Sequence, residues 1–281
     1  MRKPKIKLRN KWSRRHAKKA IPLFASFFLA HSPVPAGNTT HKQNATVVAP
    51  NTESLKFIQF ELEIYDLYEQ MGLEQAGLSL EVFNQAMVGY LNLLNDGNLS
   101  NTKILTIADF DQSSTEKRFW VLDLDAKKIL HQSLVAHGKN SGSEMAEQFS
   151  NVPQSEMSSV GFYVTQDTYQ GRHGLSLKLA GMDDEFNKNA YDRNIVVHGA
   201  EYVSEDFIKQ HGRLGRSQGC PALPMENHKE IIADIQGGSC LFLHASNAKY
   251  TSNLLDTEVA MNTFFTKALP VYAYNQMVVQ Q

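Results

Sequence analysis

Seven short runs of apolar, β-branched and aromatic residues follow one another between residues 104 and 244, and they constrain the fold more than any other feature. Each run has the length of an ordinary strand, and turn-forming residues separate most of them. The predicted strands are 104–108, 119–124, 129–136, 162–165, 175–179, 195–198 and 240–244. We therefore expect a mostly β domain at residues 98–250.

A small helical segment is expected before this domain. Residues 55–71 and 79–94 have apolar residues at helical spacing, and Ser79 is in position to cap the second helix. The turn-forming sequence Asn-Asp-Gly-Asn then ends the helical pattern. These features predict a helical N-terminal segment at residues 54–97.

Further short helices are predicted around a glycine-punctuated loop and at the C-terminus. Residues 203–210 and 225–236 have a helical pattern, and Gly237 ends the second. Residues 251–281 form a predicted C-terminal tail, in which 254–268 could be one more helix.

The first 36 residues have the pattern of an export signal or membrane anchor. Residues 1–19 contain ten Lys or Arg and no acid, and the apolar run that follows at 20–30 is too short to span a bilayer comfortably. A basic nucleic-acid-binding arm would explain the charges but not the apolar run, so no nucleic-acid partner is expected. The segment favours a periplasmic or other extracytoplasmic location, by Sec or Tat export, with membrane contact only through this signal or anchor. Residues 37–53, rich in Asn and Thr, are predicted to be a linker.

The thiol of Cys220 lies in the glycine-punctuated loop, and the predicted strand 195–198 ends upstream at His198. Thiolate is the attacking species in cysteine catalysis, and an imidazole at a strand end is held rigidly enough to serve as its base. Because Gly219 has no Cβ, the backbone there can adopt a positive φ and turn nearby amides toward an oxyanion. We therefore predict Cys220 as nucleophile and His198 as base, with Gly219 and Gln218 in the loop of the oxyanion hole.

The second cysteine, Cys240, begins the last predicted strand, which favours an inert buried thiol. An oxidising compartment would also permit a disulfide between Cys220 and Cys240, which would remove the nucleophile. A binding module stabilised by that disulfide would not react with thiol reagents, whereas an acyl-transfer enzyme would keep Cys220 titratable.

The chain has ten histidines but no CxxC, HExxH or comparable spacing, so no metal site is expected. His211, nine residues before Cys220, is an alternative base that fits better as an exposed residue at a helix end. His137 and His173 each precede a glycine, and we expect structural roles or weak substrate contacts for them.

The ordered motifs of the chain resemble those of the murein L,D-transpeptidase catalytic domain proteins, a branch of the YkuD-like cysteine transpeptidases. The resemblance extends over about residues 54–250. Among the segments that carry it are Val135-Ala136-His137-Gly138, Ser158-Ser159-Val160-Gly161-Phe162-Tyr163, Val197-His198-Gly199-Ala200 and Gly215-Arg216-Ser217-Gln218-Gly219-Cys220-Pro221. It implies a YkuD-like β-sandwich or barrel with a small helical attachment and short helices around the active-site loop.

The resemblance also implies the chemistry. Cys220 would attack the carbonyl of the third stem residue, diaminopimelate, in a peptidoglycan tetrapeptide, and terminal D-alanine would leave. A second diaminopimelate amine, a protein lysine or water would then open the acyl-enzyme. This acyl transfer needs no cofactor.

Two positions depart from the family pattern. Gln218 stands where a histidine is usual, and Ala222 stands where an arginine is usual. Arg213 and Arg216 are candidates to supply the missing positive charge, because guanidinium groups suit carboxylates. The predicted substrate-binding residues are Gly199, Arg213, Arg216 and Ser217.

Charge supports local recognition of the substrate. The whole chain has a formal net charge of −1, but the residues after position 19 contain 18 bases and 29 acids, a charge of −11. Such a protein has no global attraction to an anionic wall. Recognition should therefore be local. Arg213 and Arg216 are the main candidates for these contacts, and Arg172 and Lys178 are weaker ones.

Two other functions use the same features. A cysteine carboxypeptidase or hydrolase of wall peptides would have the same Cys220 and His198, with water as acceptor. A noncatalytic peptidoglycan-binding protein would keep the cleft without a working thiolate, and the unusual Gln218 and Ala222 make this conceivable.

Overall fold

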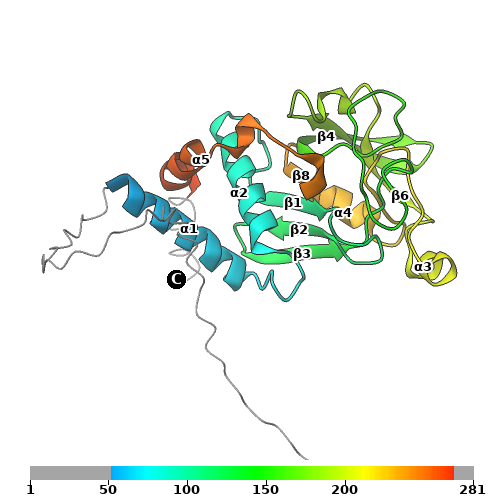
Figure 1. The fold of residues 1–281 in the computed structure, drawn as a ribbon, viewed down its shortest axis with the longest axis horizontal. Coiled ribbons are helices and arrows are strands. Elements are labelled where there is room, and N and C mark those ends of the chain that lie inside the picture. The colour runs from blue at the N-terminus through cyan, green and yellow to red at the C-terminus, as the bar shows by residue number, and fades with distance from the viewer. Residues whose placement is uncertain (1–51, 269–281) are drawn as a thin grey trace, which may run out of the picture. The chain divides into compact units, whose positions relative to one another are not determined.

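The computed structural model describes residues 52–268, which belong to one unit of the chain, residues 49–281. Within this part, eight strands form a mixed sheet in the order β3-β2-β1-β8-β4-β5-β6-β7 (Figure 1). The strands are β1 (Ile104–Asp109), β2 (Phe119–Asp123), β3 (Lys128–Ser133), β4 (Gly161–Gly171), β5 (Gly174–Gly181), β6 (Val196–Ala200), β7 (Ala222–Pro224) and β8 (Cys240–His244). The predicted fold class, a mostly β domain with helices at its N-terminal side, is confirmed.

The two edges of the sheet meet, so that it is nearly closed into a barrel. Strand β1 is parallel to β8 and β6 is parallel to β7, while the other neighbouring strands are antiparallel. Ala136, in the segment after edge strand β3, forms an isolated bridge with Ala222 of edge strand β7. Its amide donates to the Ala222 carbonyl at 2.9 Å. This closure places the segment after β3 beside the loop that precedes β7.

The central strands are buried on both faces, which explains their nearly continuous apolar sequences. In β8, Cys240 and Phe242 belong to the core on one face, whereas Leu241 and Leu243 belong to the core on the other. Alternate residues of a strand point to opposite faces, so one short run contributes to both cores.

Three helices pack on one face of the sheet. They are α1 (Thr52–Gln70), α2 (Leu80–Asn95) and α5 (Thr257–Thr263), the last continuing as the π-helical turn η4 (Phe264–Ala268). Figure 1 shows α2 next to the strands with α1 and α5 beyond it on the left. As predicted, Ser79 caps α2, because its hydroxyl accepts a hydrogen bond from the Val82 amide at 3.3 Å.

Two short helices flank the loop that contains Cys220. Helix α3 (Glu205–His211) precedes the loop, and α4 (His228–Ile235) follows β7 and buries three isoleucines in the second core. Single 3-10 turns complete the structure at η1 (Lys188–Ala190), η2 (Ser246–Ala248) and η3 (Asn253–Leu255).

The export signal or anchor predicted at residues 1–36 lies outside the described residues, as does most of the linker at 37–53 and the end of the tail at 269–281. In the described part, residues 52–268, no helix combines the length and the hydropathy that a bilayer span requires.

Candidate active site

Cys220 and His198 line the same cleft because Cys220 lies in the loop just before β7, which is the neighbour of β6, the strand that contains His198. Strands β6 and β7 are parallel, and His198 is in register with Ala222. Cys220, two residues before Ala222, lies next to Val196, two residues before His198. The Val196 amide nitrogen is 3.5 Å from the Cys220 Sγ. The sheet therefore places the two residues that the sequence proposes as nucleophile and base near each other.

Both side chains line one open cleft of about 530 Å³. The Cys220 thiol also lies 3.6 Å from the Asn194 carbonyl oxygen. Cys220 is free and partly exposed, and Cys240 is free and fully buried in β8. The disulfide alternative is therefore wrong, and burial raises the pKa of the Cys240 thiol far above its usual range.

One nitrogen of the His198 ring is fixed by the backbone. Its Nδ1 lies 2.9 Å from the Gly199 carbonyl oxygen, and since a carbonyl only accepts, Nδ1 is the protonated nitrogen. The Nε2 lone pair is then available for a proton. The ring stacks on His173, from the turn between β4 and β5, with ring centroids 4.4 Å apart. No sequence pattern signals the Gly199 contact, which supplies the orientation that a general base needs.

The electrostatics of the two groups favour a neutral pair. Burial lowers the pKa of His198, the hydrogen bond to the Gly199 carbonyl opposes this, and the neighbouring His173, His228 and Arg172 lower the pKa further. Burial also raises the pKa of the Cys220 thiol, although the Val196 amide, Arg193 and Arg172 oppose this. Across residues 52–268, no hydrogen bond joins the Cys220 Sγ to the His198 ring.

The loop before β7 is folded around Gly219. This residue has φ of +117°, and a Cβ there would lie 2.6 Å from the Met157 carbonyl oxygen, so only glycine fits. The Ser217 hydroxyl accepts from the Gly219 amide at 3.0 Å and donates to the Cys220 carbonyl at 2.6 Å. In the part of the chain that the structure describes, the Cys220 amide has no hydrogen-bond acceptor, and it is therefore a candidate oxyanion donor.

The predicted substrate-binding residues fall into different places. Arg216, Ser217 and Gln218 line the cleft, and the Arg216 guanidinium donates to the carbonyls of Lys139 and Gly142 at 3.2 and 2.8 Å. Ser217 is buried and bonded within the loop. Gly199 is buried too, and a Cβ on it would lie 2.6 Å from the His228 ring.

Arg213 lies outside the lining of the cleft and donates to the carbonyl of its neighbour Leu214 at 2.6 Å. Arg172, the weaker candidate, lines the cleft instead, with its guanidinium 3.5 Å from the Gln218 side-chain oxygen. The positive charge next to Gln218 therefore comes from the β4–β5 turn as well as from the loop.

Sequence reasoning missed Arg193. Its guanidinium lines the cleft and donates to the carbonyls of Ser150 and Met157, both at 2.7 Å, as well as to two serine hydroxyls. No motif marks this residue, because its partners lie 34 to 43 positions away in the sequence. The residues that line the cleft thus include three arginines and no carboxylate.

Three other histidines that the sequence singled out have different surroundings. His211 is exposed at the end of α3 and packs on Phe207, as expected, away from the cleft lining. His137 is buried, and its Nδ1 is 2.8 Å from the guanidinium of Arg118, which together with burial lowers the pKa of His137 to about 4. His173 contacts His198 directly.

One group of side chains could hold a cation. Asp109, Asp111 and His244 have ligand atoms within 4.8 Å of one another, at the ends of the parallel strands β1 and β8. Their polar atoms already have protein partners, for example Gln112 for Asp109 and the Ser246 amide for Asp111. The arrangement is satisfied without an ion.

Comparison with known proteins identifies the class. The family model of the L,D-transpeptidase catalytic domain (YkuD_2) matches residues 74–244, which is more than half of the chain. The chain therefore belongs to the L,D-transpeptidase catalytic domain family, as the resemblance of its motifs indicated.

Solved structures of L,D-transpeptidases are distantly similar. An L,D-transpeptidase from Mycobacterium smegmatis is 13% identical with a TM-score of 0.33, and the match covers 51% of this chain and 59% of that one. An L,D-transpeptidase from Xylanimonas cellulosilytica is 12% identical with a TM-score of 0.29, over 58% of this chain and 80% of that one. No curated protein sequence matches the chain significantly. The family assignment therefore rests on the family model.

Proposed function

We propose that the protein is a peptidoglycan L,D-transpeptidase that works through a thioester on Cys220. The observation that supports this most is the free Cys220 thiol beside His198 in one open cleft, with the His198 ring oriented by the Gly199 carbonyl. Acyl transfer needs a nucleophile, an oriented base and an oxyanion donor, and these residues together with the Cys220 amide meet that need.

The proposed reaction has two steps, acylation of Cys220 and transfer of the acyl group to an acceptor. In the first, Nε2 of His198 takes the thiol proton as the sulfur attacks the carbonyl carbon of the third stem residue. The peptide bond to terminal D-alanine breaks, and the departing amine receives the proton from His198. In the second half, an amine of another stem peptide attacks the thioester carbonyl, and His198 removes a proton from that amine as the thiol is released.

The neutral resting pair fits this sequence of proton transfers. The lowered pKa of His198 keeps the imidazole unprotonated near neutral pH, so it is ready to accept a proton. The raised pKa of Cys220 keeps the thiol protonated until a substrate is in place. The base therefore acts during attack, as in serine hydrolases, and a preformed ion pair is not required.

The arginines of the cleft supply charge for the anionic substrate. Arg172 and Arg216 line the cleft beside Gln218, and no carboxylate lines it. They take the role that the sequence assigned to Arg213 and Arg216 in place of the arginine absent at position 222. Export by the N-terminal 36 residues would deliver the protein to such a substrate.

Incubation with disaccharide-tetrapeptide, followed by mass spectrometry, tests the function. We expect a dimer that has lost one D-alanine from the exported protein, no product from Cys220→Ala, and a rate at least 100-fold lower from His198→Ala. Cys240→Ser is the matched control, because it removes a thiol outside the cleft and should leave the rate within about twofold of the parent, after allowance for stability.

The products separate the alternatives. A tripeptide monomer would show that water is the acceptor and the protein a cysteine carboxypeptidase, and a conjugate with a supplied lysine-containing peptide would show a protein acceptor. Unchanged substrate with a titratable Cys220 would contradict the proposal and favour a noncatalytic peptidoglycan-binding protein.

A further inference from the structure

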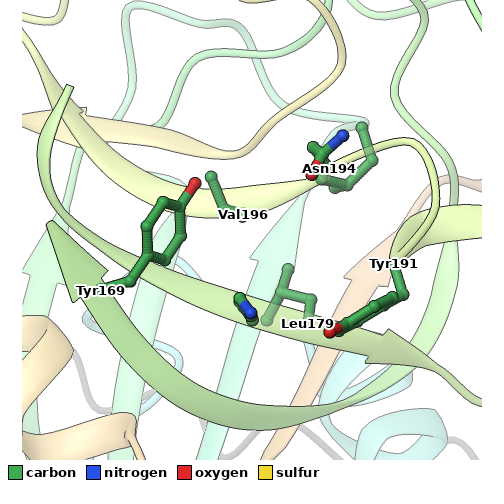
Figure 2. Close-up of a pocket in the computed structure, with 7 residues that line it drawn as sticks. Tyr169, Leu179, Tyr191, Asn194 and Val196 are labelled. Carbon is green, nitrogen blue, oxygen red and sulfur yellow. The ribbon is translucent and has the colours of Figure 1, made fainter. Parts of the chain in front are cut away.

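A second pocket, of about 320 Å³, adjoins the cleft (Figure 2). Its walls are the side chains of Tyr169, Lys178, Leu179 and Tyr191 and the segment 194–196. Tyr169 and the segment 194–196 also line the cleft that contains Cys220, so the two hollows share a wall. A molecule bound at the thiol could therefore extend into the second pocket.

The pocket contains a cation without a counter-ion. The Lys178 ammonium lies 5.7 Å from the ring centroid of Tyr169 and 5.4 Å from that of Tyr191. Within residues 52–268 it forms no ion pair and no hydrogen bond, whereas Lys139 pairs with Glu156 at 2.6 Å. Aromatic rings on two sides hold the ammonium in place but do not neutralise it. A half-buried, unpaired ammonium in a pocket suits an anionic group.

Strand register fixes the direction from the thiol to this ammonium. Lys178 of β5 is paired with Val196 of β6, and the Val196 amide contacts the Cys220 Sγ on the other side. Residues paired across strands share a face of the sheet, so Lys178 is about two strand spacings, or ~10 Å, from Cys220 at the backbone. The carboxylate of the departing D-alanine is only about one residue, ~3.8 Å, from the scissile carbonyl. A carboxylate farther along the donor peptide therefore matches the position of Lys178 better.

We propose that the pocket of Tyr169, Lys178 and Tyr191 binds a carboxylate of the acyl-donor stem peptide that is remote from the scissile bond. The inference rests on the proposed function, because it places the scissile carbonyl at Cys220. Two carboxylates have this chemistry, one at the end of the diaminopimelate side chain and one on the α-carbon of the γ-linked glutamate. Lys178 forms the ion pair, and the tyrosine hydroxyls are additional donors.

Steady-state kinetics on three tetrapeptides test the proposal: the free acid, one amidated on the diaminopimelate side chain, and one amidated on the glutamate. The parent protein should prefer the free acid at least tenfold in kcat/KM over one of the amides, which identifies the carboxylate. Lys178→Met should erase this preference by raising KM for the free acid at least tenfold, with little change in kcat. Lys178→Arg should retain most of it.

Lys128→Met is the matched control, since Lys128 lies on β3 outside both hollows and should leave all kinetic constants unchanged. Equal kcat/KM values for Lys178→Met and the parent on the free acid would overturn the inference. So would a loss of kcat alone, or an equal preference of the parent protein for acid and amide.

Binding of the free-acid tetrapeptide to Cys220→Ala, measured by calorimetry, separates this inference from the proposed function. If the parent protein turns over no peptide, the pocket still predicts that Lys178→Met weakens this binding at least tenfold. Unchanged binding, or no binding to Cys220→Ala, overturns the pocket whatever the parent protein does. A weakened binding without turnover would leave the pocket supported and the enzymatic proposal wrong.

Discussion

Burial shifts the pKa values of the two proposed reacting groups, Cys220 and His198, in opposite directions. A buried imidazole loses its cationic form and a buried thiol loses its anionic form, so the pKa of His198 falls while that of Cys220 rises. Each shift favours the uncharged state of its group. Nearby Arg172 and Arg193 favour the thiolate, but their effect is smaller than that of burial. In the proposed mechanism the charge separation therefore has to develop when substrate is bound.

The pH dependence of Cys220 alkylation follows from these directions. A thiol is unreactive below its pKa, and the pKa of Cys220 is raised, so iodoacetamide should react with a midpoint above ~8.5, the ordinary value of a free thiol. Rates measured by mass spectrometry between pH 6 and pH 10, roughly the range that brackets a free thiol, check this. Cys240 is fully buried and should remain unmodified. A midpoint below pH ~7 would show instead a thiolate and imidazolium pair in the resting protein.

Sequence reasoning predicted the candidate catalytic residues but not all of the groups that lie beside them. Cys220, Gly219 and His198 have local signals, namely a loop thiol, a glycine before it and an imidazole at a strand end. Arg193 and the stacked His173 act through contacts that only the fold creates. Arg213 shows the converse, because proximity in sequence did not bring it into the lining of the cleft.

At the scale of elements, the loop before β7 depends on its neighbour, the loop at residues 150–159. The Ser158 hydroxyl donates to the Gly219 carbonyl at 3.3 Å, and Arg193 holds the Met157 carbonyl against Gly219. The shape of the loop around Cys220 is thus determined by two loops that pack together.

Gly219→Ala should show this dependence. The new Cβ would lie 2.6 Å from a backbone oxygen and would occupy a positive φ, so we expect at least a tenfold loss of kcat/KM and a clear loss of stability. Gly97→Ala is the matched control, because it has φ of +72° with nothing within 4 Å and should add only the backbone strain, about 1–2 kcal/mol. Activity on tetrapeptide and the free energy of unfolding in urea measure the two effects. Equal results for the two variants would show that the loops do not pack as described.

The strands could be predicted from sequence because their apolar runs are continuous, and β8 was predicted at its observed bounds. Strand β7 was not predicted, because it has only three residues and ends in a proline. The near-closure of the barrel through Ala136 and Ala222 joins residues 86 positions apart, and no local pattern signals it. Local propensity therefore predicted the elements, whereas the closure that shapes the site required the structure.

At the scale of the described unit, one core joins its first and last helices. Phe264, which follows α5, is almost fully buried, and its ring lies edge-on to Phe60 of α1 with centroids 5.6 Å apart. Both belong to the same core as α2 and one face of the sheet. Residues 257–268, although they follow the predicted β domain and lie in the predicted tail at 251–281, thus contribute to the packing of the N-terminal helices.

Phe264→Ala should therefore destabilise the whole unit. Removing a buried phenylalanine costs about 3–5 kcal/mol, from lost apolar burial and from the cavity left behind. Phe57→Ala in α1 is the matched control, since Phe57 is 46% exposed and its replacement should change stability by no more than about 0.5 kcal/mol.

Urea unfolding followed by tryptophan fluorescence and by circular dichroism measures the stability of both variants, and Trp120 in the same core is a suitable probe. Coincident transitions shifted to lower urea for Phe264→Ala would show that helices and sheet unfold together. A loss confined to the helical signal, with the Trp120 transition unchanged, would show that α1, α2 and α5 unfold separately from the sheet.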